Sequence, residues 1–178
     1  MQLIETAADT TKAGDMIRKA TERDIARIVE IRNSVSENRL SDPGKVTLDD
    51  LRWFIANPGI FVWEQDGEVQ GFSAGDPCNG NIWALFVDDA YARRGIGTSL
   101  LASACSALMD AGYDRIWLTT DPGTRAEKLY RQAGWKTRHR CLIDTHSSMA
   151  FTHVFGLESI YHAWAVILKS FARMQEEP

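Results

Sequence analysis

Residues 92–98 read ARRGIGT and place two arginines and two glycines directly ahead of a helix-like stretch. They follow the apolar run Asn81 to Val87 (NIWALFV), which has the character of a strand buried on both faces. The first turn of a helix has unpaired N–H groups and the positive end of the helix dipole, so it can bind a pyrophosphate. Glycine has no Cβ and lets the backbone approach a phosphate closely, while Arg93 and Arg94 add positive charge. The spacing therefore predicts an anion-binding turn.

Two glycines before a helix are also common in ordinary turns, and that reading stays open on the spacing alone. The third glycine of a dinucleotide-binding fingerprint is missing. No Gly-Lys-Ser/Thr follows, as a P-loop would require.

Strands and helices are expected to alternate around this turn in one mixed α/β sheet. The expected strands are Met16–Ala20, Ile60–Gln65, Glu68–Ala74, Asn81–Val87 and Arg115–Thr120. The expected helices follow Thr21 and Thr47 and span Thr98–Ala111 and Thr124–Ala133. The dipeptide Asp66-Gly67 predicts a tight hairpin between two of the strands.

From Ala84 to Trp135 the sequence resembles the GCN5-related N-acetyltransferase (GNAT) family. ALFVDDAYARRGIGTSLL is similar to the acetyl-CoA motif of that family, and TRAEKLYRQAGW is similar to its later helix. The resemblance implies an α/β (α+β) fold with a mixed, mostly antiparallel central sheet that splays between two parallel strands and is flanked by helices. It also implies acetyl-CoA as cosubstrate and a primary amine as acceptor.

The resemblance assigns roles to residues along both motifs. The residues expected to bind acetyl-CoA are Leu85, Phe86, Val87, Arg93, Arg94, Gly95, Ile96, Gly97, Thr98 and Ser99. The backbone N–H of Leu85 would stabilise the oxyanion, and Tyr130 would be the general acid. The alternative for Tyr130 is a tyrosine that only packs in the core.

The acceptor site is expected between the first two helices, around ENRLSDP at residues 37–43. Arg39 would hold a substrate carboxylate, Glu37 or Asp42 would hold the incoming ammonium, and Trp83 would line the cleft. A solvated loop with helix-capping residues is the alternative.

Some positions depart from the family pattern. Ala92 stands where the family has Gln or Arg, and Asn81 stands where a catalytic carboxylate often occurs. After Trp135 the family closes with two antiparallel strands, whereas here only weak alternation and then a helix-like stretch at Leu157–Met174 are expected. The expected division is therefore an extension at 1–14, the acetyltransferase domain at 15–140 and a partly helical segment at 141–178.

The composition narrows the classes of partner. The chain has 178 residues and a net charge of −4, which disfavours a nucleic-acid binder. Three cysteines without motif spacing and the lack of an apolar signal or membrane-spanning run favour a cytoplasmic protein. The four histidines have no zinc spacing, so no metal is expected. A homodimer is left open.

These patterns together predict an acetyl-CoA-dependent N-acetyltransferase that acts on a primary amine, most simply that of a small molecule. A non-catalytic acetyl-CoA sensor and a protein N-acetyltransferase are the alternatives.

Overall fold

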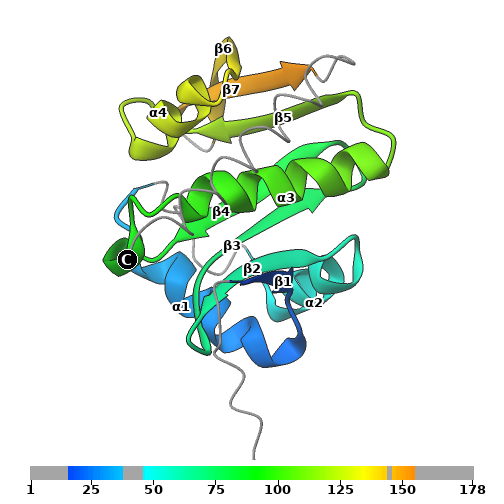
Figure 1. Ribbon diagram of the computed structural model, residues 1–178. Coiled ribbons are helices and arrows are strands. Elements are labelled where there is room, and N and C mark those ends of the chain that lie inside the picture. The colour runs from blue at the N-terminus through cyan, green and yellow to red at the C-terminus, as the bar shows by residue number, and fades with distance from the viewer. Residues whose placement is uncertain (1–15, 38–45, 144–145, 155–178) are drawn as a thin grey trace, which may run out of the picture.

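The computed structural model describes residues 16–37, 46–143 and 146–154. Within these ranges the strands form one seven-stranded sheet in the order β1-β2-β3-β4-β5-β7-β6 (Figure 1). The strands are β1 (Met16–Lys19), β2 (Ile60–Gln65), β3 (Glu68–Asp76), β4 (Asn81–Val87), β5 (Arg115–Thr120), β6 (Lys136–Ile143) and β7 (His146–Val154). The described α-helices are α1 (Ile25–Ser34), α2 (Leu48–Ala56), α3 (Ile96–Asp110) and α4 (Arg125–Gln132).

Local sequence signals account for most of these elements. Asp66 and Gly67, both at positive φ (52° and 80°), make the two-residue turn that joins β2 to β3. The Thr47 hydroxyl accepts a hydrogen bond from the Asp50 N–H at the start of α2. Thr124 does the same for the Glu127 N–H at the start of α4.

Helices cover both faces of the sheet, and each face has its own apolar core (Figure 1). On one face, Ile28 and Ile31 of α1 and Leu51 of α2 pack against the strands. On the other face, α3 and α4 contribute a second core that includes Leu108 and Tyr130. The predicted mixed α/β fold is confirmed.

The centre of the sheet splays where β4 meets β5. These strands are parallel neighbours, as predicted, but the ladder between them has the single partner pair Asn81 and Trp117. On its other side β4 stays paired with β3 as far as Val87. Within the described residues, the β4 edge beyond Asn81 therefore has no strand partner, and the two strands diverge toward their C-terminal ends.

The expectation that the closing strands are missing is wrong. β6 and β7 pair antiparallel from Lys136↔Thr152 to Ile143↔His146, and β7 also pairs antiparallel with all of β5. The expected boundary at residue 140 falls inside β6, so the sheet continues beyond it. The expected helix at Leu157–Met174 lies outside the described residues, as does the extension at 1–14.

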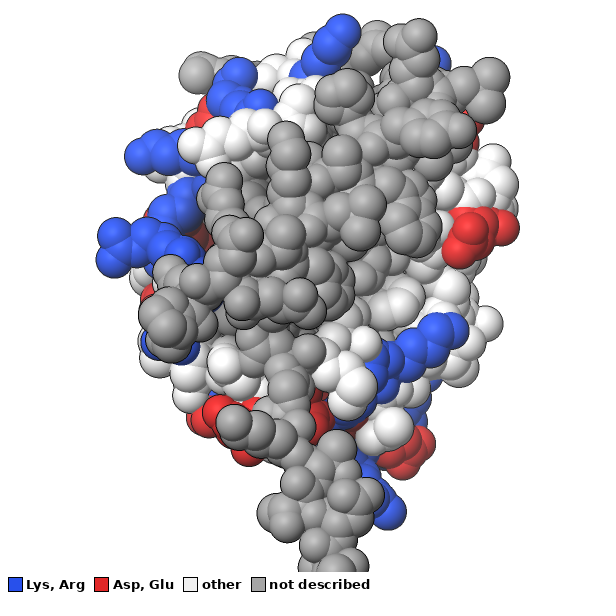
Figure 2. All heavy atoms as spheres, viewed as in Figure 1, with Lys and Arg blue, Asp and Glu red and all other residues white. Residues whose placement is uncertain are grey.

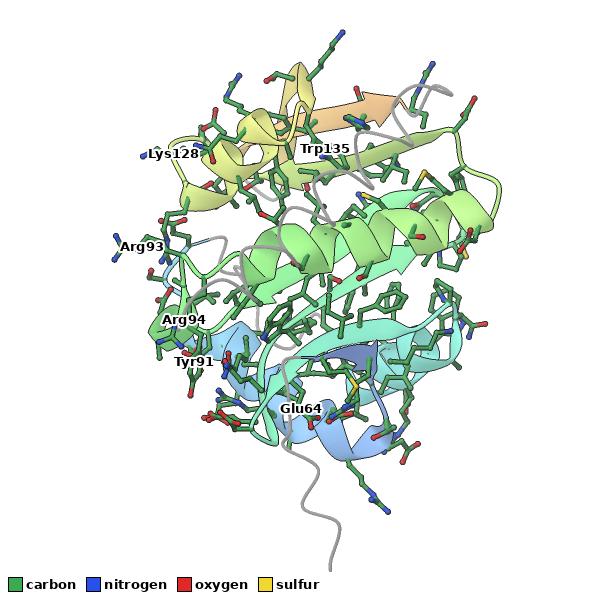
Figure 3. The ribbon with its side chains drawn as sticks, in the orientation of Figure 1. Glu64, Tyr91, Arg93, Arg94, Lys128 and Trp135 are labelled. Atoms are coloured by element: carbon green, nitrogen blue, oxygen red, sulfur yellow. The ribbon has the colours of Figure 1, made fainter. Side chains whose placement is uncertain are left out.

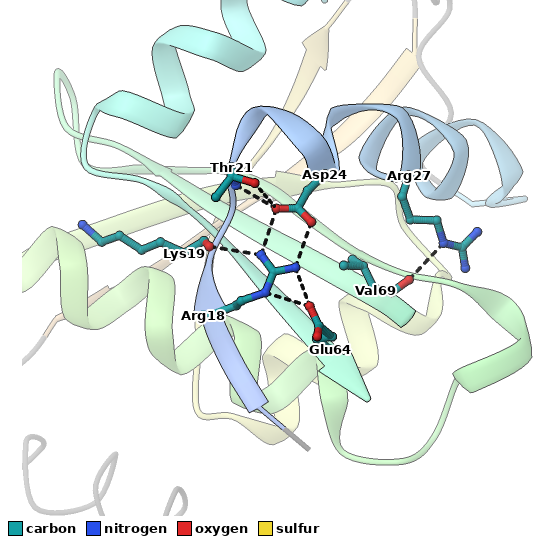
Figure 4. Close-up of polar contacts among 7 residues, drawn as sticks. All are labelled: Arg18, Lys19, Thr21, Asp24, Arg27, Glu64 and Val69. Carbon is teal, nitrogen blue, oxygen red and sulfur yellow. Dashed lines mark hydrogen bonds and ion pairs between the residues drawn. The ribbon is translucent and has the colours of Figure 1, made fainter. Parts of the chain in front are cut away.

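A compact ion network fastens the edge strand β1 to the rest of the fold (Figure 4). The Arg18 guanidinium donates to both carboxylate oxygens of Asp24, each at 2.8 Å, and its Nε donates to Glu64 Oε2 at 2.7 Å. Asp24 also accepts from the Thr21 N–H at 2.7 Å. The pKa of Asp24 is lowered to about 2, chiefly by its hydrogen bonds to Arg18.

None of the described helices combines the length and the apolar character that a bilayer crossing requires.

Candidate active site

A cavity of about 470 Å³ lies at the C-terminal end of β4, where the sheet splays. Leu85, Phe86 and Val87 form its strand wall. The start of α3 and one face of α4 form the opposite walls. The sequence placed its two motifs on these same elements, and the fold brings them to one cavity.

The turn before α3 presents backbone donors to this cavity. Arg93 and Gly95 both have positive φ, 68° and 82°, and Gly95 is the residue that precedes the helix. The first intrahelical hydrogen bond runs from the Ser99 N–H to the Gly95 carbonyl, at 3.2 Å. The N–H groups of Ile96, Gly97 and Thr98 precede that bond, so they have no intrahelical acceptor. Such a turn is built to receive an anion.

Gly97 leaves space that faces the cavity rather than the core. A Cβ added there would meet Leu129 Cδ2 at 3.6 Å and Val87 Cγ2 at 3.7 Å, which are ordinary contacts. The protein interior therefore does not require glycine at this position. A bound phosphate would require glycine at this position, because a methyl group would stand beside the free N–H groups. Together with the unpaired β4 edge, this space fits the pyrophosphate and pantetheine of a coenzyme A ester.

Basic side chains gather along the edge of the molecule where α3 and α4 begin (Figure 2). Arg93 and Lys128 reach out on this same side (Figure 3), and both line the cavity. Arg94 instead lies over the Tyr91 ring, with its Cζ 5.3 Å from the ring centroid, and it does not line the cavity. Of the two arginines that the sequence singled out, the structure brings only Arg93 to the site.

Tyr130 lies on α4, lines the cavity and is 5% exposed. Its ring packs against Trp135 and Phe151, with centroids 5.9 and 6.0 Å away. Burial, and secondarily the nearby Cys105 thiol, raises the pKa of the Tyr130 phenol well above its usual value. The phenol therefore stays protonated at neutral pH, and the tyrosine is both packed and open to the cavity.

Of the four residues expected to bind the acceptor, the structure describes two, Glu37 and Trp83. Glu37 lines the cavity, but both of its carboxylate oxygens accept hydrogen bonds from Arg125. Trp83 does not line the cavity; its ring stacks on Phe54 of α2, with centroids 4.0 Å apart. Arg39 and Asp42 lie outside the described residues.

Most of the expected cofactor residues meet at the cavity. Those that line it are Leu85, Phe86, Val87, Arg93, Gly95, Ile96, Gly97 and Thr98. Ser99 does not line the cavity, and its N–H donates to the Gly95 carbonyl. Sequence reasoning missed Asp89, Arg125 and Lys128, which also line it. The two basic residues stand three positions apart on α4, a spacing that places them on one helical face.

Among the described residues, no group of three or more His, Cys, Asp or Glu side chains could hold a metal ion. The described lining of the cavity supplies backbone N–H donors, cationic and acidic side chains, and the Tyr130 phenol.

Comparison with known families decides the class of this site. The model of the acetyltransferase (GNAT) family matches residues 25–135, which is more than half of the chain and includes every wall of the cavity. The chain belongs to the acetyltransferase (GNAT) family. The family resemblance is thereby confirmed.

GNAT relatives and neighbours place the match in context. A mycothiol acetyltransferase of Clavibacter sepedonicus is 30% identical over 104 residues, which are 53% of this chain and 34% of that protein. The match thus spans about a third of the length of the curated relative. Ard1 from Thermoplasma volcanium has a TM-score of 0.69 at 18% identity, over 80% of this chain and 99% of that one.

A further solved structure shares the fold of this chain. The yncA protein of Salmonella typhimurium, described as an acetyltransferase and solved with its cofactor acetyl-CoA, has a TM-score of 0.62 at 18% identity. The aligned region covers 81% of this chain and 95% of the yncA chain. At such identities these two neighbours show the shared fold.

Proposed function

We propose that this protein transfers the acetyl group of acetyl-CoA to a primary amine of a small molecule. The observation that carries the proposal is the meeting of three features at one cavity: the splayed edge of β4, the unpaired N–H groups that open α3, and the Tyr130 phenol. The curated relative is by its name a mycothiol acetyltransferase, which favours a small-molecule acceptor.

The residues of this chain divide the binding of acetyl-CoA between them. The N–H groups of Ile96, Gly97 and Thr98 would hold the pyrophosphate, with Arg93 and Lys128 beside it. Phe86 and Val87 would pair with the pantetheine arm along the open edge of β4, as an added strand does. The arm would thereby carry the thioester into the splay toward Leu85.

The transfer then needs one new bond, one broken bond and two proton movements. The amine nitrogen attacks the acetyl carbon, and the Leu85 N–H would stabilise the oxyanion that forms. The carbon–sulfur bond breaks, and its electron pair goes to sulfur. The Tyr130 phenol would donate its proton or a hydrogen bond to that sulfur. Because burial raises the phenol's pKa while a thiol has a pKa of about 8.5, full proton transfer from the phenol to sulfur is uphill.

The amine must lose its own proton, and the described residues supply no evident base for it. Asn81 has no basic group, and the Glu37 carboxylate is occupied by Arg125. We therefore infer that the neutral amine is selected from solution or deprotonated through water, and that the proton which the nitrogen must release after its attack on the acetyl carbon also passes to water. The rate should then rise with pH toward the pKa of the amine.

A thiol-release assay tests the proposal. The full chain and acetyl-CoA are mixed with a panel of small primary amines and of peptides with free N-termini or lysines, and free coenzyme A thiol is measured. Release with a small amine supports the proposal. Release with peptides alone would identify a protein acetyltransferase. Tight binding of acetyl-CoA by calorimetry without any release would identify a sensor, and the lack of binding would refute the function altogether.

A further inference from the structure

Two carboxylates line the cavity that is proposed to receive a polyanion. They belong to Glu37, which follows α1, and to Asp89, which lies in the turn between β4 and α3. Coenzyme A brings a diphosphate and a 3′-phosphate to such a site. Carboxylates at this position repel those charges and lose their water when the ligand covers them.

The guanidinium of Arg125 is hydrogen-bonded to both of these carboxylates. Arg125 Nη2 donates to Asp89 Oδ1 at 2.6 Å, and Arg125 Nε donates to Glu37 Oε1 at 3.3 Å. The Arg125 backbone N–H, at the start of α4, donates to Glu37 Oε2 at 2.7 Å. Arg125 thus links the start of α4 to two distant positions of the chain. Glu37 is 88 residues away in the sequence, and Asp89 is 36 residues away.

The other two cations of the cavity are placed differently. Within the described part of the chain, neither Arg93 nor Lys128 has an ion-pair partner, although both line the same cavity as Arg125. Their charges are available to an incoming phosphate. The charge of Arg125 is already committed to the two acids, so its function differs from theirs.

We propose that Arg125 is a positioning residue that neutralises Glu37 and Asp89, so that the phosphates of coenzyme A can enter a cavity that these acids would otherwise make repulsive. This inference rests on the proposed function. It assigns to Arg125 an effect that operates through the two carboxylates rather than through a phosphate contact of its own. Without Arg125, both acids would be covered by the ligand without a cationic partner.

The variant Arg125→Gln tests this while preserving the helix. Glutamine is a good helix former, and the backbone N–H that holds Glu37 is kept. The Arg125 side chain is 49% exposed, so its ion pairs add little to stability and the chain should fold normally. Arg131→Gln is the matched control, because Arg131 lies on the same helix with a 51% exposed side chain and does not line the cavity.

Calorimetric affinities for three ligands separate an electrostatic effect from a general one. Arg125→Gln should bind coenzyme A on the order of tenfold more weakly. The loss should be smaller for 3′-dephospho-coenzyme A. It should be within about twofold for pantetheine, which has no phosphate. Arg131→Gln should match the wild type with all three ligands.

A second substitution distinguishes neutralisation from direct contact. In the Arg125→Gln background, Asp89→Asn should restore a large part of the lost coenzyme A affinity, because one of the two acids that Arg125 neutralised is gone. In the Lys128→Gln background the same Asp89→Asn change should restore markedly less, since Arg125 still holds Asp89 there. Equal gains in both backgrounds would overturn the proposal, and so would an equal loss of affinity for pantetheine. If the wild type does not bind coenzyme A at all, the proposed function fails instead.

Discussion

Replacing Gly97 by alanine should separate the binding of coenzyme A from the folding of the chain. Gly97 is the second residue of α3, and its missing Cβ leaves an opening toward the cavity. The added methyl would meet only Leu129 Cδ2 at 3.6 Å and Val87 Cγ2 at 3.7 Å. The protein itself therefore has room for alanine, whereas a bound phosphate would have to move away from the N–H groups beside it.

The substitution should leave stability unchanged or raise it while it weakens the binding of coenzyme A, and both effects can be estimated. Alanine in a helix is favoured over glycine by up to about 1 kcal/mol, less in the first turn, so the melting temperature should stay level or rise by about 2–4 °C. Losing one hydrogen bond to a charged phosphate costs about 1.5–3 kcal/mol. That free energy corresponds to roughly 10- to 150-fold weaker binding of coenzyme A.

Calorimetry with coenzyme A, together with a thermal melt of the same sample, measures both quantities. Pantetheine is the control ligand, because it lacks the phosphates and its affinity should change little. Unchanged coenzyme A affinity in Gly97→Ala would refute the placement of the pyrophosphate at this turn. A melting temperature several degrees lower would show that Gly97 is required by packing, against the contact distances given above.

Three more substitutions follow from the same structure. Tyr130→Phe keeps the buried ring, so acetyl-CoA affinity and stability should survive while turnover with an active amine falls by about 10²- to 10⁴-fold; equal turnover would remove the phenol from the mechanism. Lys128→Gln should weaken coenzyme A binding and make it less sensitive to salt, and an unchanged salt dependence would exclude a phosphate contact. The Asp24 pKa is lowered by Arg18 to about 2, so this pair contributes stability above the unfolded pKa of about 4 and loses it as the pH falls toward 2. Between pH 5 and pH 2, urea unfolding of Asp24→Asn should therefore show about 2 kcal/mol less acid destabilisation than the wild type, and parallel pH profiles would count against the ion network.

The directions of individual side chains were the least predictable part of the site. Trp83 was expected in the cleft because it lies on a central strand, but a stacked contact with Phe54 of α2 takes up its ring. Arg94 neighbours Arg93 in sequence, yet the turn directs its guanidinium over Tyr91. Adjacent residues diverge in this way because side-chain direction depends on backbone angles that composition and spacing do not specify.

The sequence by itself determined the parts of this protein whose causes are local. The Asp66-Gly67 hairpin, the glycine turn ahead of α3 and the apolar stripe of that helix follow from a few neighbouring residues, and two linked motifs were enough to identify the family. Only the tertiary structure decided the pairing of β7 with both β5 and β6, because partner strands stabilise sequences whose own alternation is weak.

The charge balance of the cavity was likewise decided by the tertiary structure. Arg125 meets Glu37 across 88 positions and Asp89 across 36, and no pattern within a helix or a strand encodes either contact. The splay that opens the cavity lies between β4 and β5, which share a single partner pair, whereas β5 pairs along its whole length with β7 on its other side. Sequence patterns specify which residues can bind a phosphate, but long-range packing determines which charges surround it.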